Sequence, residues 1–392
     1  MTRKTTRLAA SRRSAVAPFL AMDVLREAGA LEAQGLSIMH LEVGEPGAPP
    51  PAPVRAAAIA ALQGGRVGYT DALGRASLRA RIARHYGETY NVDIAPGRIV
   101  VTTGSSGGFI LAFLALFEPG DRVAVAAPGY PAYVNILEAL GCICAPLETS
   151  PATRHCVTAE MIAAAHAQAP LKGVLLMSPA NPSGVMMSKT DLADVCATCD
   201  QLGIAFISDE IYHGLTYERP AETALEFSDA AIVVNSFSKY YCMTGWRVGW
   251  LVLPQDLVRP AERLQQSLAI SVPFLSQVAA EAAFSARDEL EAVKAGYVRN
   301  RAALTAALPE MGLGDFHPPD GAFYFYVDIG RFTNDSLDFS KRLLEEAGVA
   351  ATPGVDFDRT RGHRALRLSY AGPEADVAEA IARMKNWLGR SV

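Results

Sequence analysis

Short apolar runs that end in a turn recur along the middle of the chain, and a helical pattern follows each of them. The runs are rich in β-branched residues, which favours strands, and the helical patterns between them favour parallel strands joined by crossovers. We therefore expect strands at 99–103, 122–127, 173–177, 205–208, 231–235 and 248–253. This alternation predicts an α/β protein built on a mostly parallel sheet.

Several helix boundaries can be placed from capping signals. Ser188, with Asp191 three residues later, is typical of a helix start, and Gly203 stands where that helix should end. An apolar helix is expected from about Gly108, and Pro273 could open a long helix that runs to about residue 298.

The chain changes character toward its C-terminus, which indicates a second domain. A strand is expected over 321–328, a helix over 337–347 and another strand over 365–370. A Pro-rich linker is expected over 46–53, because consecutive prolines restrict the backbone. At 392 residues the chain is longer than one domain usually is. We expect an arm that contributes to a small α+β domain, a large α/β domain and the small domain itself, at 1–46, 47–290 and 291–392.

Composition and charge exclude some classes of protein. The formal net charge is −5, whereas a nucleic-acid binder would carry a basic surplus. No apolar run reaches the roughly 18 residues that a membrane-spanning helix needs. The first 22 residues include Arg3, Lys4 and Arg7 and contain no acid, which is too polar for a secretory signal. An organelle transit peptide would fit this composition, but we favour a basic end on a cytoplasmic protein.

The six cysteines do not form a disulfide framework in a chain of this length. Cys196 and Cys199 form a single CxxC inside a predicted helix, and no second Cys or His pair stands at the spacing of a zinc site. We expect neither a metal nor a redox role for them.

The residues that follow the predicted strands include many polar side chains that can bind a ligand or react with it. In open α/β sheets, ligands bind beyond the carboxyl ends of the strands, so these residues should share one edge. They are Gly104-Ser105-Ser106-Gly107, Gly129-Tyr130, Asn181 between two prolines, Asp209-Glu210-Ile211-Tyr212 and Ser236-Phe237-Ser238-Lys239. Each has an ordinary alternative as a turn, a cap or a solvated loop, but their joint placement favours one site.

A phosphorylated pyridine aldehyde would suit this set of residues. Aromatic neighbours should desolvate Lys239 and lower its pKa, so that its amine could attack a carbonyl. An acid at a nearby strand end could keep a pyridine nitrogen protonated, and an aromatic ring could stack on the heterocycle. A phosphate would lie at the helix that begins near Ser105, with Arg247 as its counter-charge. A nicotinamide dinucleotide fits less well, because no GxGxxG joins a strand to a helix.

The segment Ser236-Phe237-Ser238-Lys239-Tyr240-Tyr241-Cys242-Met243-Thr244-Gly245-Trp246-Arg247-Val248-Gly249 resembles the lysine-attachment signature of the class I/II aminotransferases, which are fold-type I pyridoxal-phosphate-dependent enzymes. Further motifs of this aspartate-aminotransferase-like family recur in the same order over nearly the whole chain: 43–46, 68–70, 181–184, 208–212 and 366–370. The resemblance implies a three-layer α/β/α domain, a smaller α+β domain and pyridoxal 5′-phosphate as cofactor.

The resemblance also implies a role for each matching residue. Lys239 would hold the cofactor as a Schiff base and move the substrate's proton, and Asp209 would bond the pyridine nitrogen. The other implied contacts are Asn181 and Tyr212 to the phenolic oxygen, Tyr130 stacked on the ring, Ser105, Ser106, Ser236, Ser238 and Arg247 around the phosphate, and Arg367 with Gly44 at the substrate's α-carboxylate. Tyr69 would reach the phosphate of a neighbouring subunit, which implies a homodimer.

The reaction implied is transfer of an amino group from an L-amino acid to a 2-oxo acid, in two half-reactions. A basic residue often stands where this chain has Ser106, which puts recognition of aspartate or glutamate in doubt unless another arginine, such as Arg154 or one from a partner, replaces it. An apolar or small amino acid is at least as plausible. The alternatives are a β-lyase, C–S lyase or other enzyme of the same fold, and a non-catalytic cofactor-binding sensor.

Overall fold

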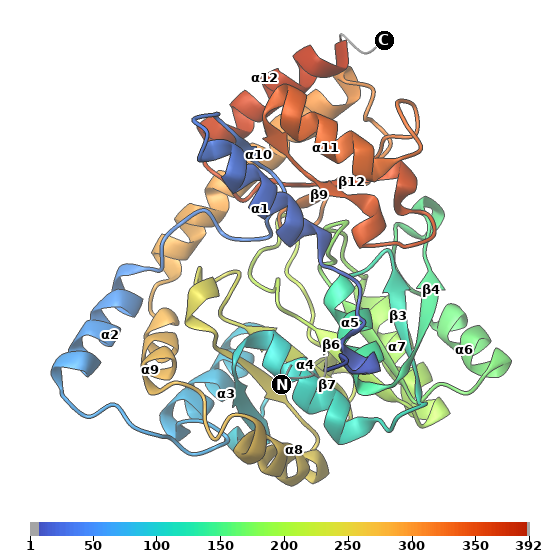
Figure 1. The fold of residues 1–392 in the computed structure, drawn as a ribbon. Helices are drawn as coiled ribbons and strands as arrows, with labels where there is room; N and C mark the ends of the chain where they lie inside the picture. The colour runs from blue at the N-terminus through green and yellow to red at the C-terminus, as the bar shows by residue number, and fades with distance from the viewer. Residues whose placement is uncertain (1–7, 390–392) are drawn as a thin grey trace, which may run out of the picture.

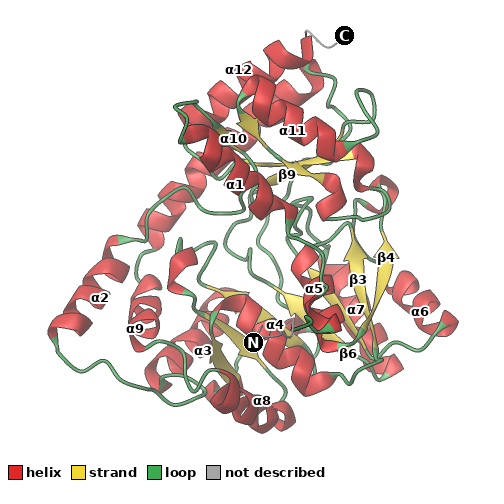
Figure 2. Cartoon of the chain, viewed as in Figure 1, coloured by secondary structure: helices red, strands yellow, loops and turns green. Residues whose placement is uncertain are grey.

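A computed structural model describes residues 8–389, so Arg3, Lys4 and Arg7 of the basic N-terminal segment lie outside the described residues. The chain forms a lower part around one large sheet and an upper part around two small sheets (Figures 1 and 2). None of the helices within residues 8–389 combines the length and the apolar character needed to cross a membrane.

The large sheet has seven strands in the order β2-β8-β7-β6-β5-β3-β4. Their bounds are β2 Ile99–Thr102, β3 Arg122–Ala127, β4 Ile143–Glu148, β5 Gly173–Met177, β6 Ala205–Asp209, β7 Ile232–Ser236 and β8 Gly249–Val252. Only β8 runs antiparallel to its neighbours, so the carboxyl ends of the other six strands meet at one edge. The six strands predicted from sequence all form.

Strand β4 was not predicted, and its place in the sheet explains why. It pairs only with β3 and therefore forms an edge of the sheet. Its side chains alternate between exposed and more buried positions, and Pro146 lies within it. Proline is tolerated at an edge, where a backbone N–H has no ladder partner to lose. The strand therefore lacks the continuous apolar run of its buried neighbours.

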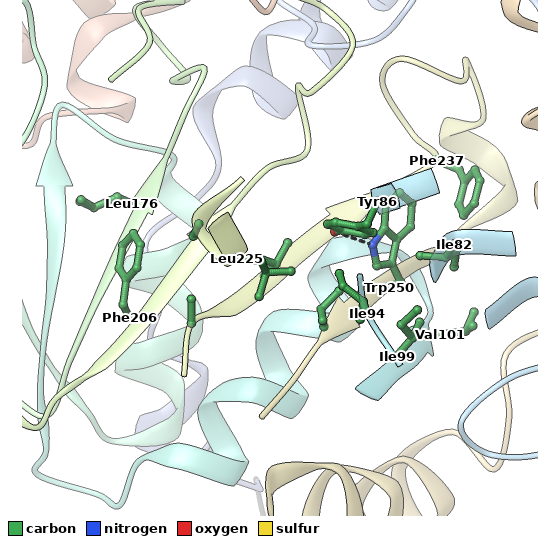
Figure 3. Packing of buried hydrophobic residues seen from close by; sticks show 14 of the residues in the cluster. Ile82, Tyr86, Ile94, Ile99, Val101, Leu176, Phe206, Leu225, Phe237 and Trp250 are labelled. Carbon is green, nitrogen blue, oxygen red and sulfur yellow. Dashed lines mark hydrogen bonds between the residues drawn. The ribbon is translucent and has the colours of Figure 1, made fainter. Parts of the chain in front are cut away.

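Helices cover both faces of this sheet. The helices are α2 Ala52–Gln63, α3 Ala76–Tyr90, α4 Gly104–Leu116, α5 Pro131–Leu140, α6 Ala159–Gln168, α7 Lys189–Leu202, α8 Gln255–Leu268 and α9 Phe274–Ala283. Alternate strand residues pack with α4, α5 and α8 on one face and with α2, α3, α6, α7 and α9 on the other. On the second face Trp250 Nε1 donates to Tyr86 Oη at 3.1 Å inside the apolar layer (Figure 3). The result is a three-layer α/β/α arrangement.

The upper part is built from elements of both the N-terminal and the C-terminal regions of the described chain. Its helices are α1 Leu20–Glu32, α10 Arg287–Glu310, α11 Ser336–Ala347 and α12 Glu374–Gly389, and its strands are β1 Met39–His40, β9 Tyr324–Asp328, β10 Val349–Ala350, β11 Thr352–Pro353 and β12 Ala365–Ser369. Strand β1 pairs with β10, while β11, β12 and β9 form an antiparallel sheet. Strand β1 of the N-terminal arm thus pairs with a strand from the C-terminal part of the chain.

Two predicted helix boundaries and the linker need correction. Helix α4 begins at Gly104 rather than near Gly108, because its first turn is made of small residues and the apolar pattern starts only in the second turn. The linker is shorter than expected, since Pro53 already lies in the first turn of α2, where proline is accepted. The helix expected from Pro273 to about residue 298 is two helices, α9 and α10.

The break between α9 and α10 has a local cause. Ser285 donates its backbone N–H and its hydroxyl to the carbonyl of Ala282, which replaces the helical pattern with a turn. Asp288 and Glu289 then stand in the first turn of α10, where acidic side chains favour a new helix start. The caps of α7 agree with the prediction: Ser188 accepts from Asp191 N, and Gly203 is left-handed with φ 63°.

Candidate active site

A cavity of about 500 Å³ lies between the carboxyl edge of the large sheet and the strands of the upper part. Eleven of the site residues predicted from sequence line this cavity: Gly44, Ser105, Ser106, Tyr130, Asn181, Asp209, Tyr212, Ser238, Lys239, Arg247 and Arg367. The fold therefore brings together eleven residues from distant parts of the chain, and only Ser236 and Tyr69 of the predicted set lie elsewhere.

Lys239 follows β7 and extends its amine into the cavity. Its Nζ donates to the backbone carbonyl of Gly44, a residue of the N-terminal arm. Burial lowers the pKa of Lys239 to about 8, and the nearby positive charge of Arg367 acts in the same direction. An amine with this pKa is partly unprotonated near neutral pH, so it can attack a carbonyl group.

Asp209 ends the neighbouring strand β6 and is almost completely buried. Its carboxylate accepts from Ile211 N at 3.0 Å and from the Tyr133 hydroxyl. Burial raises the pKa of Asp209 to about 7, although these two bonds pull the pKa down. Tyr133 was not predicted; it lies on α5, three residues after Tyr130, which is the N-cap of that helix, and the two rings pack edge-on at 5.3 Å.

An anion-binding corner forms where α4 begins. Ser105 and Ser106 lie in the first turn of α4, whose free N–H groups favour negative charge. Gly104 has φ +71°, and a Cβ placed there would come within 2.5 Å of Arg247 Nη2. Arg247 Nη1 donates to the Thr244 carbonyl at 2.9 Å, and no carboxylate within residues 8–389 forms an ion pair with it.

Ser236 adjoins the anion-binding corner through Ser238. Its side chain is buried and does not line the cavity. The Ser236 hydroxyl lies 2.9 Å from that of Ser238 and 3.1 Å from the Val248 carbonyl. Ser236 therefore contacts Ser238, which does line the cavity, and its own place at the phosphate stays a prediction.

Arg367 on β12 forms the opposite wall and is 2% exposed. Its guanidinium lies between the rings of Tyr324 and Phe357, at 4.5 and 4.8 Å. It donates to Asn181 Oδ1 at 3.0 Å, to Thr352 Oγ1 at 3.1 Å and to the Glu42 carbonyl. All these acceptors are neutral, and Nε has no partner among the described residues. A buried cation held only by neutral groups suits an incoming carboxylate.

Two tyrosines connect the walls of the cavity. The hydroxyls of Tyr212 and Tyr324 lie 2.6 Å apart, and burial raises the pKa of each. A Cβ on Gly44 would lie 2.0 Å from Tyr324 Oη, so this glycine is required for the two to pack together. Tyr324 was missed because the sequence signal was only an aromatic strand, without a register that placed one ring in the cavity.

Helix α1 supplies an apolar wall that sequence reasoning also missed. Phe19, Met22 and Leu25 line the cavity and come from the N-terminal arm. They stand three residues apart, which places them on one side of the helix, and this apolar spacing in the sequence could have predicted the wall. The wall faces the space near Arg367 and Tyr130, and Phe19 packs edge-on against Tyr130 at 5.8 Å.

Tyr69 and Arg154 lie outside the cavity. Tyr69 is 83% exposed, in the loop between α2 and α3. Arg154 bonds both carboxylate oxygens of Asp320, at 3.0 and 2.9 Å, so the suggestion that it reads a substrate's distal carboxylate within its own subunit is wrong.

The cysteines of the CxxC pair are buried free thiols in α7. Burial raises the pKa of Cys196 and of Cys199 to about 12. A thiol with so high a pKa holds almost no reactive thiolate near neutral pH.

Comparison with known proteins gives consistent similarities. Residues 37–384 match the family described as aminotransferase class I and II. The chain is 46% identical over 380 residues to a valine–pyruvate aminotransferase of Mycobacterium tuberculosis, covering 96% of this chain and 97% of that protein. It is 32% identical over 370 residues to an aspartate aminotransferase of Thermotoga maritima, covering 94% and 96%. The crystal structure of an aminotransferase from Mycobacterium tuberculosis superposes with a TM-score of 0.95 at 45% identity, covering 98% and 100% of the two chains.

Pyridoxal 5′-phosphate, the cofactor of this family, fits the residues present. Its phosphate matches the corner at the start of α4, where no carboxylate of residues 8–389 pairs with Arg247. Its pyridine nitrogen matches the buried carboxylate of Asp209, and its aldehyde matches the amine of Lys239. Three separate chemical demands are thus met by groups that line one cavity.

Proposed function

The chain belongs to the class I and II aminotransferases, and from this premise we propose that it transfers the amino group of an apolar L-amino acid, such as L-valine, to pyruvate. The observation that carries the proposal is the presence in one cavity of a buried Arg367, which forms no ion pair among the described residues, and of the apolar wall of Phe19, Met22 and Leu25. The guanidinium suits an α-carboxylate, and the wall suits a side chain without charge.

Each residue of the chain then has a defined task. Pyridoxal 5′-phosphate, when bound, withdraws electrons from the substrate's Cα. The Lys239 amine holds the cofactor and afterwards moves the Cα proton. The Asp209 carboxylate keeps a proton on the pyridine nitrogen, and burial lets it act without competition from water. Asn181 and Tyr212 bond the phenolic oxygen, and Tyr130 stacks on the ring.

The remaining contacts fix the two anionic groups. Ser105, Ser106, Ser236, Ser238 and Arg247 hold the phosphate, and the hydroxyls of Ser236 and Ser238 contact each other. Arg367 holds the substrate's α-carboxylate beside Gly44. Both tasks use charge-assisted hydrogen bonds, which orient a reactant as well as bind it.

The charges around the cavity support an apolar substrate. Its three cationic residues are Lys239, Arg247 and Arg367, and each already has a task in the scheme above. The carboxylate of Glu45 also lines the cavity, where it accepts from Thr244 Oγ1, and it would repel a second substrate carboxylate. The name of the 46% identical relative, a valine–pyruvate aminotransferase, agrees with this choice.

A screen of the twenty amino acids against pyruvate, oxaloacetate and 2-oxoglutarate tests the proposal. We expect the highest kcat/KM for L-valine or a similar apolar amino acid with pyruvate, and a rate for L-aspartate at least about tenfold lower. Preferred turnover of aspartate would contradict the substrate class. Release of ammonia without any keto acid acceptor would instead indicate a lyase.

We further propose that the protein is a homodimer in which Tyr69 reaches the phosphate of the neighbouring site. The side chain of Tyr69 is 83% exposed, which is far more than is usual for a tyrosine in a folded protein. Other large apolar side chains are exposed near it in sequence, on helices of the large sheet or in the loop after α8: Ile59, Leu62, Val67, Ile110, Leu114, Leu268 and Ile270. Such exposure is typical of a subunit interface.

Mixing two inactive variants tests the shared site. Lys239→Ala removes the amine of its own site, and Tyr69→Ala removes the ring given to the partner. A mixed dimer contains one site with both groups, so refolding the two together should restore activity that neither homodimer has. Failure to restore activity, with dimers present by light scattering, would exclude the exchange of Tyr69.

We also propose a cytoplasmic location. All six cysteines are free in the structure, as is usual in a reducing compartment. Fractionation of the source cells tests this, and recovery in a membrane or secreted fraction would contradict it.

A further inference from the structure

The first turn of α1 is capped by a residue from the other end of the chain. Phe19 precedes this helix and its side chain cannot accept a hydrogen bond. Instead Asp356 Oδ1 accepts from Leu20 N at 2.9 Å and Oδ2 accepts from Ala21 N at 3.3 Å. Asp356 is 8% exposed, in a 3₁₀ turn (354–356) between β11 and β12. The carboxylate therefore satisfies two N–H groups that would otherwise lack partners.

Helix α1 has two faces with different surroundings. One face carries Val24, Ala28 and Leu31, which pack in an apolar cluster with Ile38, Leu344 and Ala350. Helix α1 itself lies in the upper part of the molecule (Figure 1). The other carries Met22 and Leu25, which line the active-site cavity together with Phe19. Met22 remains 50% exposed, so apolar packing alone does not hold this end of the helix.

The segment that holds α1 also holds the carboxylate-binding arginine. Phe357 follows Asp356 directly, and its ring packs against the Arg367 guanidinium at 4.8 Å. The Phe357 carbonyl accepts from Gly129 N at 3.0 Å, next to Tyr130. One short segment thus sets the distance between Arg367 and the apolar wall. That distance decides which side chain fits a substrate whose α-carboxylate lies on Arg367.

We propose that Asp356 is a positioning residue for substrate selection: by capping α1 it fixes Phe19, Met22 and Leu25 as the wall that receives an apolar substrate side chain. This inference rests on the proposed function and adds to it the residue that sets the specificity. Asp356 does not line the cavity, so it acts through α1 rather than by contact with the substrate.

Binding of two unreactive carboxylates to the holoenzyme tests the proposal. Acetate can occupy only the carboxylate site, whereas isovalerate adds a branched apolar group that needs the wall. Each buried CH₂ contributes about 0.8 kcal/mol, so the wild type should bind isovalerate roughly tenfold more tightly than acetate, or better. In Asp356→Ala we expect the Kd of isovalerate to rise about fivefold, which corresponds to the roughly 1 kcal/mol that a helix cap contributes to stability, and that of acetate to change less than twofold.

Three further variants make the result specific. Asp356→Asn keeps one oxygen acceptor and should recover most of the isovalerate affinity. Met22→Ala, at a half-exposed position, should weaken isovalerate about threefold without unfolding the protein. Asp335→Ala is the matched control, since Asp335 caps α11 through Leu337 N and Asp338 N outside the cavity, and it should leave both Kd values unchanged.

The outcomes separate the inference from the proposed function. A wild type that binds acetate and isovalerate equally would refute the apolar substrate class itself. A wild type that prefers isovalerate, with the same preference in folded Asp356→Ala and Asp356→Asn, would overturn the positioning role alone. In turnover, Asp356→Ala should raise KM for L-valine about fivefold and change kcat little, and an equal loss in both parameters for L-alanine and L-valine would also overturn the role.

Discussion

The carboxylate of Asp209 is almost completely buried, so its negative charge is costly to maintain without a positive partner. Water cannot solvate the charge there, and burial raises its pKa to about 7 from the ordinary 3.8. The Tyr133 hydroxyl and Ile211 N–H offset part of that effect. The cofactor's pyridine nitrogen would supply the missing positive partner. Asp209 is thus retained for chemistry at a cost to the stability of the protein without cofactor.

The first prediction follows from this pKa. Because the folded-state pKa is raised to about 7, the folded chain binds a proton that the unfolded chain releases between about pH 4 and 7. Stability due to this group is therefore complete below pH 4 and is lost as pH rises through 7. Asp209→Asn removes that dependence, so without cofactor its Tm should match the wild type near pH 4 and exceed it at pH 8.

Thermal unfolding of the cofactor-free proteins at these two pH values measures the difference. The same variant with cofactor should turn over at least about a hundredfold more slowly, because a neutral amide cannot hold the proton on the ring nitrogen. A lower Tm than wild type at pH 8, or an undiminished rate, would contradict this account of Asp209.

At the scale of elements, the sequence predicts what local patterns determine and misses what distant partners determine. The six strands with buried apolar runs and both caps of α7 follow from neighbouring residues, and so does the placement of Lys239 and Asp209 at one sheet edge. Tyr324 and the wall of α1 reach the cavity only through packing between residues far apart in the chain. The residues next to them in the sequence do not indicate these long-range contacts.

Family resemblance supplied the rest of the predicted site. Arg367 stands on an ordinary strand, and only the matching motif indicated its part; its burial between two rings explains why an arginine is tolerated there. The same motif placed Ser236 at the phosphate; its hydroxyl lies 2.9 Å from that of Ser238, and its contact with the phosphate stays a prediction.

The start of α4 gives the second prediction. Gly104→Ala places a methyl group within 2.5 Å of Arg247 Nη2 and forces alanine into φ +71°. Arg247 must then move away from the anion-binding corner, so we expect the Kd for pyridoxal 5′-phosphate to rise about tenfold. Spectroscopic titration of the protein with the cofactor measures this.

Gly203→Ala is the matched control for Gly104→Ala. Gly203 has a similar φ of +63°, but a Cβ there meets nothing within 4 Å. Both variants should lose about 1 kcal/mol of stability from the strained backbone, and only Gly104→Ala should lose cofactor affinity. Equal cofactor affinities in the two variants would show that the corner does not bind the phosphate.

For the whole molecule, function depends on two parts that meet at one cavity. The large sheet supplies Lys239, Asp209 and the anion corner, while the upper part supplies Arg367 and the wall of α1. The expected domain limits at 46 and 290 stay a prediction, although β1 of the arm does pair with β10. A substrate that bridges both parts would hold them together, and this couples binding to their relative position.

The third prediction concerns assembly. Ile59 on α2 is 56% exposed, and we place it at the subunit interface. Ile59→Glu should weaken the dimer, because a buried carboxylate there would have to lose its water. Light scattering should show monomer at concentrations where the wild type is dimeric, with activity falling in parallel. Leu337→Glu, at a 49% exposed position on α11, is the control and should leave both unchanged. An Ile59→Glu dimer as stable as wild type would refute this interface.

The most direct test of the whole account is chemical mapping of the lysine that binds the cofactor. The protein is incubated with pyridoxal 5′-phosphate, reduced with borohydride and digested, and the labelled peptide is identified by mass spectrometry. The buried amine with its pKa lowered to about 8 predicts one label, on Lys239, with the visible absorption lost in Lys239→Ala. A label on another lysine, or an unchanged spectrum in Lys239→Ala, would contradict the account.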